Sequence, residues 1–362
     1  MMESLIIKNF KNLKNLIVPD LAQVNLITGK NNVGKSTLLE ALFLYAGNGN
    51  LADLKKLMTD RGYTLTDGEI ENASVFYSLF YNFAAERSDA SSIHIGSSDT
   101  AVLTLQIKYM LLGTTSDKNG NLWTVRKFVD SPADNDGTGT IHDCIAVQAS
   151  DDGFASMTAY RLDTLETVFA PIKKDKINYR LIKSGDLLKD DNSVLWDSVV
   201  MTEKEAYVKD ALHIIEPDIE ALSFIANHAG TRVPMMKLKN DLRRYRLSSA
   251  GDGINRILTI VLNMVNCENG FFLIDEFENG LHYSVQAKLW EIIFKLSREL
   301  NIQVFATTHS NDCIRSFSET MVDSNEALGK VFRLERRQIG ITAVEYTSRE
   351  LAIATNNDIE IR

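Results

Sequence analysis

The chain has little cysteine, no long apolar run and no excess of positive charge. Its three cysteines, Cys144, Cys267 and Cys313, lie far apart, so they form neither a disulfide framework nor the close spacing of a zinc site. No apolar run reaches the ~18 residues that a membrane-spanning helix needs. The first residues also lack the basic start and apolar core of a secretory signal. We therefore expect a cytoplasmic protein with reduced thiols and no membrane partner.

The charge balance is acidic. The 48 Asp and Glu residues outnumber the 39 Lys and Arg residues, which gives a net charge of −9. An acidic surface repels a phosphate backbone, so the composition argues against a protein whose whole surface binds nucleic acid. A local patch is still compatible with it, because residues 237–246 hold a dense basic run. That run fits either a solvated strand face or a set of phosphate contacts.

Residues 29–36 form a phosphate-binding motif. They read Gly-Lys-Asn-Asn-Val-Gly-Lys-Ser, which is the Gly-x4-Gly-Lys-Ser pattern of a P-loop. The apolar residues 24–27 before it predict a buried strand, and residues 35–45 after it predict a helix. Lys35 is expected to reach the β- and γ-phosphates, and the Ser36 hydroxyl to bind Mg²⁺. The motif predicts a nucleoside triphosphate site.

Two further segments predict groups at the same edge of the sheet. Residues 271–276 are four apolar residues followed by Asp275 and Glu276, so Asp275 would hold Mg²⁺ and Glu276 would orient or deprotonate the attacking water. Residues 305–310 run through a strand into Thr-Thr-His-Ser, which places His309 near the γ-phosphate. Taken alone, the acids fit a solvated strand end and the histidine fits a structural role. Together with the P-loop they predict a catalytic site.

Residues 247–253 precede an apolar helix and read Leu-Ser-Ser-Ala-Gly-Asp-Gly. An ordinary helix N-cap explains this composition. The other interpretation is a second phosphate-binding helix N-terminus, because the free N–H groups and the helix dipole attract anions. One chain needs no second such site for one nucleotide, but a dimer does if each subunit offers this loop to its partner's nucleotide.

The remaining pattern predicts an α/β fold with an interrupted core. Strands and helices alternate at both ends of the chain, which favours a parallel sheet built from both termini. Residues 48–83 and 186–227 have mainly helical spacing, the latter with Ile219, Leu222 and Ile225 on its buried side, whereas residues 93–147 predict an antiparallel sheet. We assign residues 1–47 and 247–362 to a P-loop ATPase core. Residues 48–246 form an inserted region with helical and antiparallel parts and a partner-facing lobe.

The order of these motifs resembles the ABC-type ATPase heads shared by SMC, RecF and OLD (overcoming lysogenization defect) proteins. The segments 6–11, 251–256, 275–282 and 307–310 look most like short OLD-like bacterial ATPases that lack a Toprim nuclease domain. The resemblance implies a P-loop NTPase fold with a parallel core sheet, an antiparallel sheet and an inserted, mainly helical lobe. It covers nearly the whole chain, although residues 48–240 match only in layout.

The resemblance also implies a site shared between two heads that sandwich ATP and Mg²⁺. Catalysis would fall to Glu276 and His309, and the metal to Ser36 and Asp275. The nucleotide would meet, from one head, Gly29, Asn31, Asn32, Gly34, Lys35, Ser36 and Thr37, and from the other head Ser249 and Gly251. The chain reads Ser-Ala-Gly where ABC signatures usually read Ser-Gly-Gly, so either serine of the loop remains a candidate for the phosphate contact. The glutamine loop of the family is not identifiable.

We therefore expect an ATP-hydrolysing switch that forms a homodimer or a higher oligomer. In the resembling family such ATPases regulate a separate effector, a nuclease or a toxin, commonly in bacterial defence against phage. The main alternative is a RecF- or SMC-like scaffold or loader that binds DNA. The ATPase subunit of a membrane transporter fits less well, because the long insertion and the signature at 252–256 differ. A small-molecule kinase would need neither the signature loop nor His309.

Overall fold

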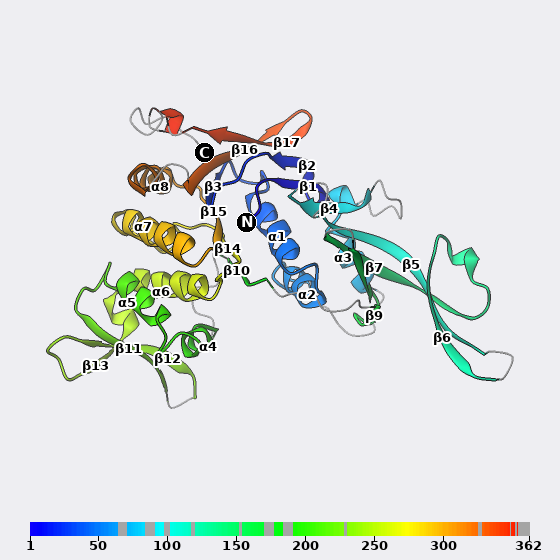
Figure 1. The fold of residues 1–362 in the computed structure, drawn as a ribbon, viewed down its shortest axis with the longest axis horizontal. Helices are drawn as coiled ribbons and strands as arrows, with labels where there is room; N and C mark the ends of the chain where they lie inside the picture. Colours follow the sequence, from blue (N-terminus) through cyan, green and yellow to red (C-terminus); the bar gives the residue numbers. More distant parts are fainter. Residues whose placement is uncertain are drawn as a thin grey trace.

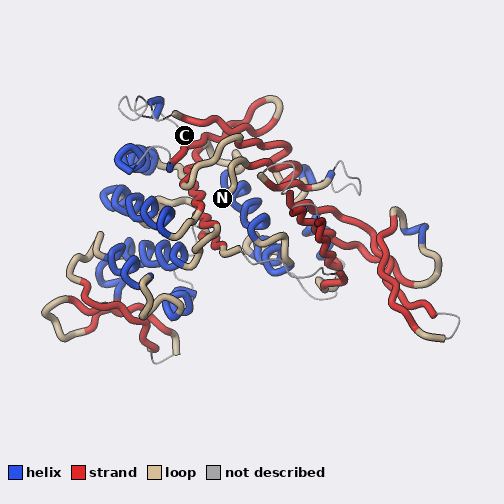
Figure 2. The backbone as a smooth tube through the Cα atoms, viewed as in Figure 1, coloured by secondary structure: helices blue, strands red, loops and turns tan. Residues whose placement is uncertain are grey.

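The computed structural model describes residues 1–63, 71–83, 91–97, 102–116, 120–151, 154–169, 177–183, 191–227, 230–324, 328–347, 349–351 and 353. It contains a parallel central sheet, a large antiparallel sheet and a small lobe with its own sheet (Figures 1 and 2). In the described part of the chain, no helix combines the length and the apolar character that crossing a membrane requires.

The central sheet carries the predicted motifs. Its six strands run in the order β10-β14-β15-β3-β16-β17, and all neighbours are parallel except the last pair. The strands are β3 (Val24–Thr28), β10 (Tyr179–Ile182), β14 (Phe271–Ile274), β15 (Gln303–Thr307), β16 (Gly329–Arg337) and β17 (Gly340–Tyr346). The sheet is therefore built from both ends of the chain, as expected, and β10 from the middle also joins it.

Helices cover both faces of this sheet, which explains why β3, β14 and β15 are buried at every position. On one face lie α6 (Asp252–Val265), α7 (Tyr283–Glu299) and α8 (Asn311–Ser324), and on the other lies α1 (Lys35–Ala46), as Figure 1 shows. Successive strand residues point to opposite layers. Leu26 packs in the cluster that contains α6, α7 and α8, whereas Ile27 packs with α1.

The antiparallel sheet begins with the N-terminal strands and extends away from the core (Figure 1). Its order is β2-β1-β4-β5-β7-β8-β9, with β6 paired to β5. The elements are β1 (Leu5–Phe10), β2 (Leu13–Val18), β4 (Ile93–Gly96), β5 (Val102–Ser116), β6 (Leu122–Val129), β7 (Gly139–Asp151), β8 (Phe154–Arg161) and β9 (Thr167–Phe169), with the helices α2 (Leu51–Thr59) and α3 (Glu71–Tyr77). The antiparallel prediction for residues 93–147 is confirmed in the described residues.

The lobe beside α6 combines helices with a three-stranded sheet. It comprises α4 (Asp191–Asp197), α5 (Lys204–Leu212), β11 (Ile219–Ala226), β12 (Arg232–Leu238) and β13 (Arg244–Arg246). The helical prediction is wrong over residues 219–226, which pair antiparallel with β12. A shift of register between Ile219 and Ala221 puts both Ile219 and Leu222 on the buried side, so a β-bulge imitates helical spacing. Residues 64–70 and 186–190 of the predicted helical segments lie outside the described residues.

A buried ion cluster fixes α1 against the antiparallel sheet. Lys11, in the turn between β1 and β2, places its Nζ 2.7 Å from the Glu40 Oε2 of α1, and Arg61 Nη2 lies 2.8 Å from the same oxygen. Burial lowers the pKa of Lys11 to about 8, against the attraction of Glu40. Burial also raises the pKa of Glu40, but the charges of Lys11 and Arg61 outweigh it and hold that pKa below its ordinary value.

We predict that Glu40→Gln destabilises the protein by about 3 kcal/mol, because it leaves the Lys11 ammonium buried without its countercharge. Urea unfolding at pH 7 measures this, with Glu291→Gln on the exposed side of α7 as the control, for which we expect less than about 0.5 kcal/mol. Since the folded-state pKa of Glu40 is lowered, its contribution is present above the unfolded pKa and is lost as the pH falls through the folded value. Equal effects of the two variants would contradict the cluster's role.

Candidate functional site

The P-loop is a backbone cradle between β3 and α1. Three of its residues have positive φ: 138° at Gly29, 62° at Asn32 and 92° at Gly34. At Gly29 only glycine fits, because a Cβ there would lie 2.6 Å from the backbone O of Leu334. The bend ends at Gly34, the N-cap of α1, so the first N–H groups of that helix are available to an anion. The cradle has the shape that a phosphate requires.

Lys35 lies where the cradle meets the other motifs. Its Nζ donates to the backbone O of Gly29 at 2.6 Å and of Lys30 at 3.0 Å, and it lies 3.2 Å from Nδ1 of His309. Burial lowers the pKa of Lys35 to about 8, against the attraction of the carboxylates of Asp275, Glu278 and Glu276. The ammonium thus joins the P-loop to the predicted acids and to the histidine.

The two acids follow β14 and are held by the end of β15. Thr307 Oγ1 donates to Asp275 Oδ1 at 2.5 Å and accepts the N–H of Glu276 at 2.9 Å. Glu276 has a left-handed backbone with φ of 50°, an uncommon conformation for a residue with a side chain. Its Oε1 lies 3.9 Å from Nε2 of His309. Asp275, Glu276 and His309 therefore meet at one edge of the sheet, as the sequence predicts.

Sequence reasoning missed two residues that organise this edge. Glu278 accepts the N–H of His309 at 2.7 Å with Oε1 and the Thr308 hydroxyl at 2.8 Å with Oε2. Thr307 supplies the hydroxyl that joins Asp275 to Glu276. Both belong to segments that the sequence singles out, the acidic run after β14 and the Thr-Thr-His-Ser run. The sequence contained a signal for them, because both lie among the polar residues next to the predicted catalytic residues Glu276 and His309.

The other P-loop positions surround the cradle. Ser36, Asn31 and Asn32 are exposed, and Thr37 is buried in the first turn of α1. Arg336 Nη2 donates to the backbone O of Asn32 at 3.2 Å. Their contacts with a nucleotide stay predictions.

A magnesium ion fits the donors at this edge. The Ser36 hydroxyl and the Asp275 carboxylate are the hard oxygen donors that Mg²⁺ prefers. No group of three or more His, Cys, Asp or Glu side chains in the described residues has metal-binding geometry. A metal at this edge would therefore take the rest of its ligands from nucleotide phosphates and water, which is how Mg²⁺ usually binds in such sites.

The signature loop directly precedes α6. Ser249 belongs to the short 3₁₀ helix η4 (Leu247–Ala250), and Gly251, with φ of 98°, is the N-cap of α6. Both residues are exposed. The hydrogen bonds recorded here are local: Ser249 Oγ donates to the backbone O of Arg246 at 2.6 Å, and the Gly251 N–H donates to the backbone O of Ser248 at 3.1 Å. In the described part of the chain, no hydrogen bond joins Ser249 or Gly251 to the P-loop.

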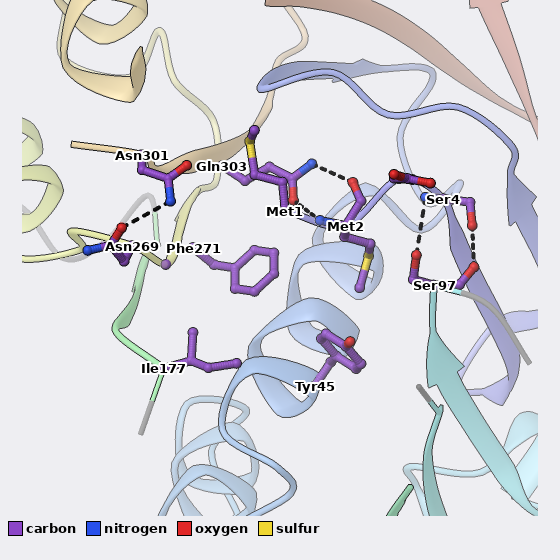
Figure 3. Close-up of a pocket in the computed structure, with 12 residues that line it drawn as sticks. Met1, Met2, Ser4, Tyr45, Ser97, Ile177, Asn269, Phe271, Asn301 and Gln303 are labelled. Carbon is purple, nitrogen blue, oxygen red and sulfur yellow. Dashed lines mark hydrogen bonds between the residues drawn. The ribbon is translucent and has the colours of Figure 1, made fainter. Parts of the chain in front are cut away.

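A cavity of about 440 Å³ lies at the opposite edge of the sheet (Figure 3). Phe271 and Gln303, the first residues of β14 and β15, line it together with Met2 and Tyr45. Gln303 is held there by hydrogen bonds to both backbone groups of Met2. The predicted catalytic groups follow the carboxyl ends of the same strands, so this cavity lies at the other edge from them.

The P-loop and the sheet that carries it define a P-loop ATPase whose fold is like that of SMC heads. The model of a family described as AAA ATPase domain matches residues 1–125 and 171–314, and the chain belongs to this family. The expected fold class is thereby confirmed.

Individual proteins are also similar to this chain. An ATP/GTP phosphatase of Helicobacter pylori is 26% identical over 367 residues, which cover 90% of each chain. An uncharacterized protein of Methanocaldococcus jannaschii is 36% identical over 135 residues, or 35% of this chain and 58% of that one. A crystal structure of an SMC head bound to the C-winged helix domain of ScpA covers 96% of this chain and 98% of its own, with 14% identity and a TM-score of 0.50. This last likeness shows the fold alone.

We predict that Lys35→Ala weakens ATP binding about a hundredfold, because it removes a cation that would make charge-assisted hydrogen bonds to phosphate. Isothermal titration calorimetry measures the change. Lys288→Ala, an exposed position on α7, is the control and should bind ATP as the wild type does. Unchanged affinity in Lys35→Ala would rule out the cradle as the triphosphate site.

Proposed function

We propose that the protein is a Mg²⁺-dependent ATPase that works as a switch: ATP closes a homodimer, and hydrolysis reopens it. The convergence of Lys35, Glu276 and His309 at one edge of the sheet carries this proposal. In it, the P-loop N–H groups and Lys35 bind the phosphates, and Ser36 and Asp275 hold the metal, which neutralises phosphate charge when bound. The Glu276 carboxylate orients the attacking water and accepts its proton.

The position of the signature loop supports the dimer. Ser249 and Gly251 are exposed at the N-terminus of α6, where N–H groups and the helix dipole favour an anion. Their recorded hydrogen bonds are local to the loop. A second copy that turns its own nucleotide toward this loop would complete both sites with the same pair of surfaces, as a two-fold symmetric dimer requires.

We also propose a separate effector protein, a nuclease or a toxin, which the closed dimer releases or activates in defence against phage. The resemblance to OLD-like ATPases supports this role by analogy. In the similar crystal structure, an SMC head carries a domain of another protein. Affinity purification of the intact chain with and without ATP identifies such a partner, and its recovery should depend on the nucleotide.

The central test uses Glu276→Gln, which keeps the size of the side chain but removes the proton acceptor. We expect ATP binding to persist, hydrolysis to fall by about 10²-fold or more, and dimers to accumulate in light scattering after gel filtration. Adding Ser249→Arg should abolish the dimer without loss of nucleotide binding, because the bulky cation blocks the signature loop. Glu291→Gln is the matched control. Normal hydrolysis in Glu276→Gln, or a monomer that stays monomeric with bound ATP, would refute the sandwich.

The alternative function is DNA binding through residues 237–246. Acidic side chains next to that run argue against it. Lys237 Nζ lies 2.6 Å from Glu220 Oε2, and Arg243 Nη2 lies 3.0 Å from Asp241 Oδ2. These pairs are exposed and individually weak, but they neutralise charges that would otherwise attract phosphates. Arg244 and Arg246 are exposed on β13.

We predict that duplex DNA binds more weakly than about 100 µM at physiological salt. Fluorescence anisotropy over a salt series measures this for the wild type and for the double variant Arg244→Ala/Arg246→Ala. Tight, salt-dependent binding that the double variant loses would instead favour the DNA scaffold.

A further inference from the structure

Arg256 is a buried cation that the proposed hydrolysis does not yet use. It lies in the second turn of α6, and none of its side chain is exposed. Its neighbours Ile254, Ile257 and Leu258 are buried apolar residues of the same helix. Burying a guanidinium is costly unless hydrogen bonds compensate it. A charge in this place therefore needs a reason beyond packing.

The Arg256 guanidinium contacts the backbone of Glu276, which is the predicted general base. Arg256 Nη2 donates to the carbonyl O of Glu276 at 3.3 Å. The N–H of the same peptide group belongs to Phe277 and donates to the carbonyl O of Thr307 at 2.9 Å. One peptide is thus held at both ends, by α6 on one side and by β15 on the other.

This peptide needs to be held. Glu276 has φ of 50°, and a left-handed conformation is unfavourable in a residue other than glycine. Next to it, the Phe277 ring stacks on Trp290 with ring centroids 3.9 Å apart, which fixes the following residue. Because the backbone angles of Glu276 set the direction of its Cα–Cβ bond, the contact with Arg256 bears on where the carboxylate points.

We propose that Arg256 is a positioning residue: it holds the left-handed backbone of Glu276 so that the carboxylate faces the nucleotide, and it ties that carboxylate to the signature loop. The second part follows from the helix, since α6 begins directly after Gly251, at the loop that a second copy would contact. This inference rests on the proposed role of Glu276 in hydrolysis.

The test compares Arg256→Met with Arg256→Lys in the full-length protein. Methionine fills the apolar surroundings but cannot donate a hydrogen bond, so kcat should fall about tenfold or more, as expected when a catalytic group is displaced. KM for ATP and ATP-dependent dimer formation should stay within about twofold of the wild type. Lysine retains a cation and a donor, so Arg256→Lys should recover part of the lost kcat. Thr259→Val, which changes another buried polar residue of α6, is the control and should keep the wild-type kcat.

The design separates this inference from the proposed function. If Glu276→Gln abolishes hydrolysis while Arg256→Met keeps the wild-type kcat, the inference fails and the function stands. If Glu276→Gln hydrolyses normally, the proposed function fails. A proportional loss of ATP binding, dimer formation and melting temperature in both Arg256 variants would show a merely structural role and overturn the inference. In the Glu276→Gln background, Arg256→Met should lower hydrolysis no further; an additional tenfold loss would also overturn it.

Should Arg256→Met not fold, Arg256→Lys alone decides the question. The lysine side chain is shorter than that of arginine, so its ammonium cannot hold the peptide in the same position. We therefore expect a lower kcat with an unchanged KM and an unchanged melting temperature. A wild-type kcat in a folded Arg256→Lys, or a fall in kcat that only follows a fall in melting temperature, would count against positioning.

Discussion

The site depends on the parallel pairing of β3, β14 and β15. Their register aligns Ile274 of β14 with Ala306 of β15, and Ala306 with Leu26 of β3. Because parallel strands end at the same edge of a sheet, the P-loop, the two acids and His309 are brought together although they lie far apart in the sequence. The helices on both faces make this sheet a buried core, so the edge is a rigid base for groups that have to be positioned within tenths of an ångström.

Two side chains convert this shared edge into one polar network. The Thr307 hydroxyl is donor to Asp275 and acceptor from Glu276, so one group sets the relation between the predicted metal ligand and the predicted base. Glu278 holds the segment of His309 through two hydrogen bonds. Connected polar groups of this kind specify geometry because a broken member would leave another without its partner. The backbone strain at Glu276 is maintained by the same surroundings.

The motifs were predictable from local sequence patterns, whereas the contacts that connect them depend on the tertiary structure. The P-loop, the acids after an apolar strand and the antiparallel region were predictable because each is defined by residue types within a few positions. The helical prediction over β11 failed since a bulge at Ile219 to Ala221 changed the strand period. The pairing of β10 with β14 and the hydrogen bonds of Thr307 and Glu278 join residues far apart or in separate loops, so no local pattern contains them. The role of Ser249 as a contact for a second copy stays a prediction.

The charges at the edge give an argument for a divalent cation. Lys35 is attracted by three carboxylates, those of Asp275, Glu278 and Glu276. A triphosphate that enters this edge adds further negative charge, and one ammonium with the N-terminus of α1 does not balance all of it. A metal held by the Ser36 hydroxyl and the Asp275 carboxylate would supply the missing positive charge. The carboxylates at this edge would repel a nucleotide without a metal ion and would favour binding of its magnesium complex.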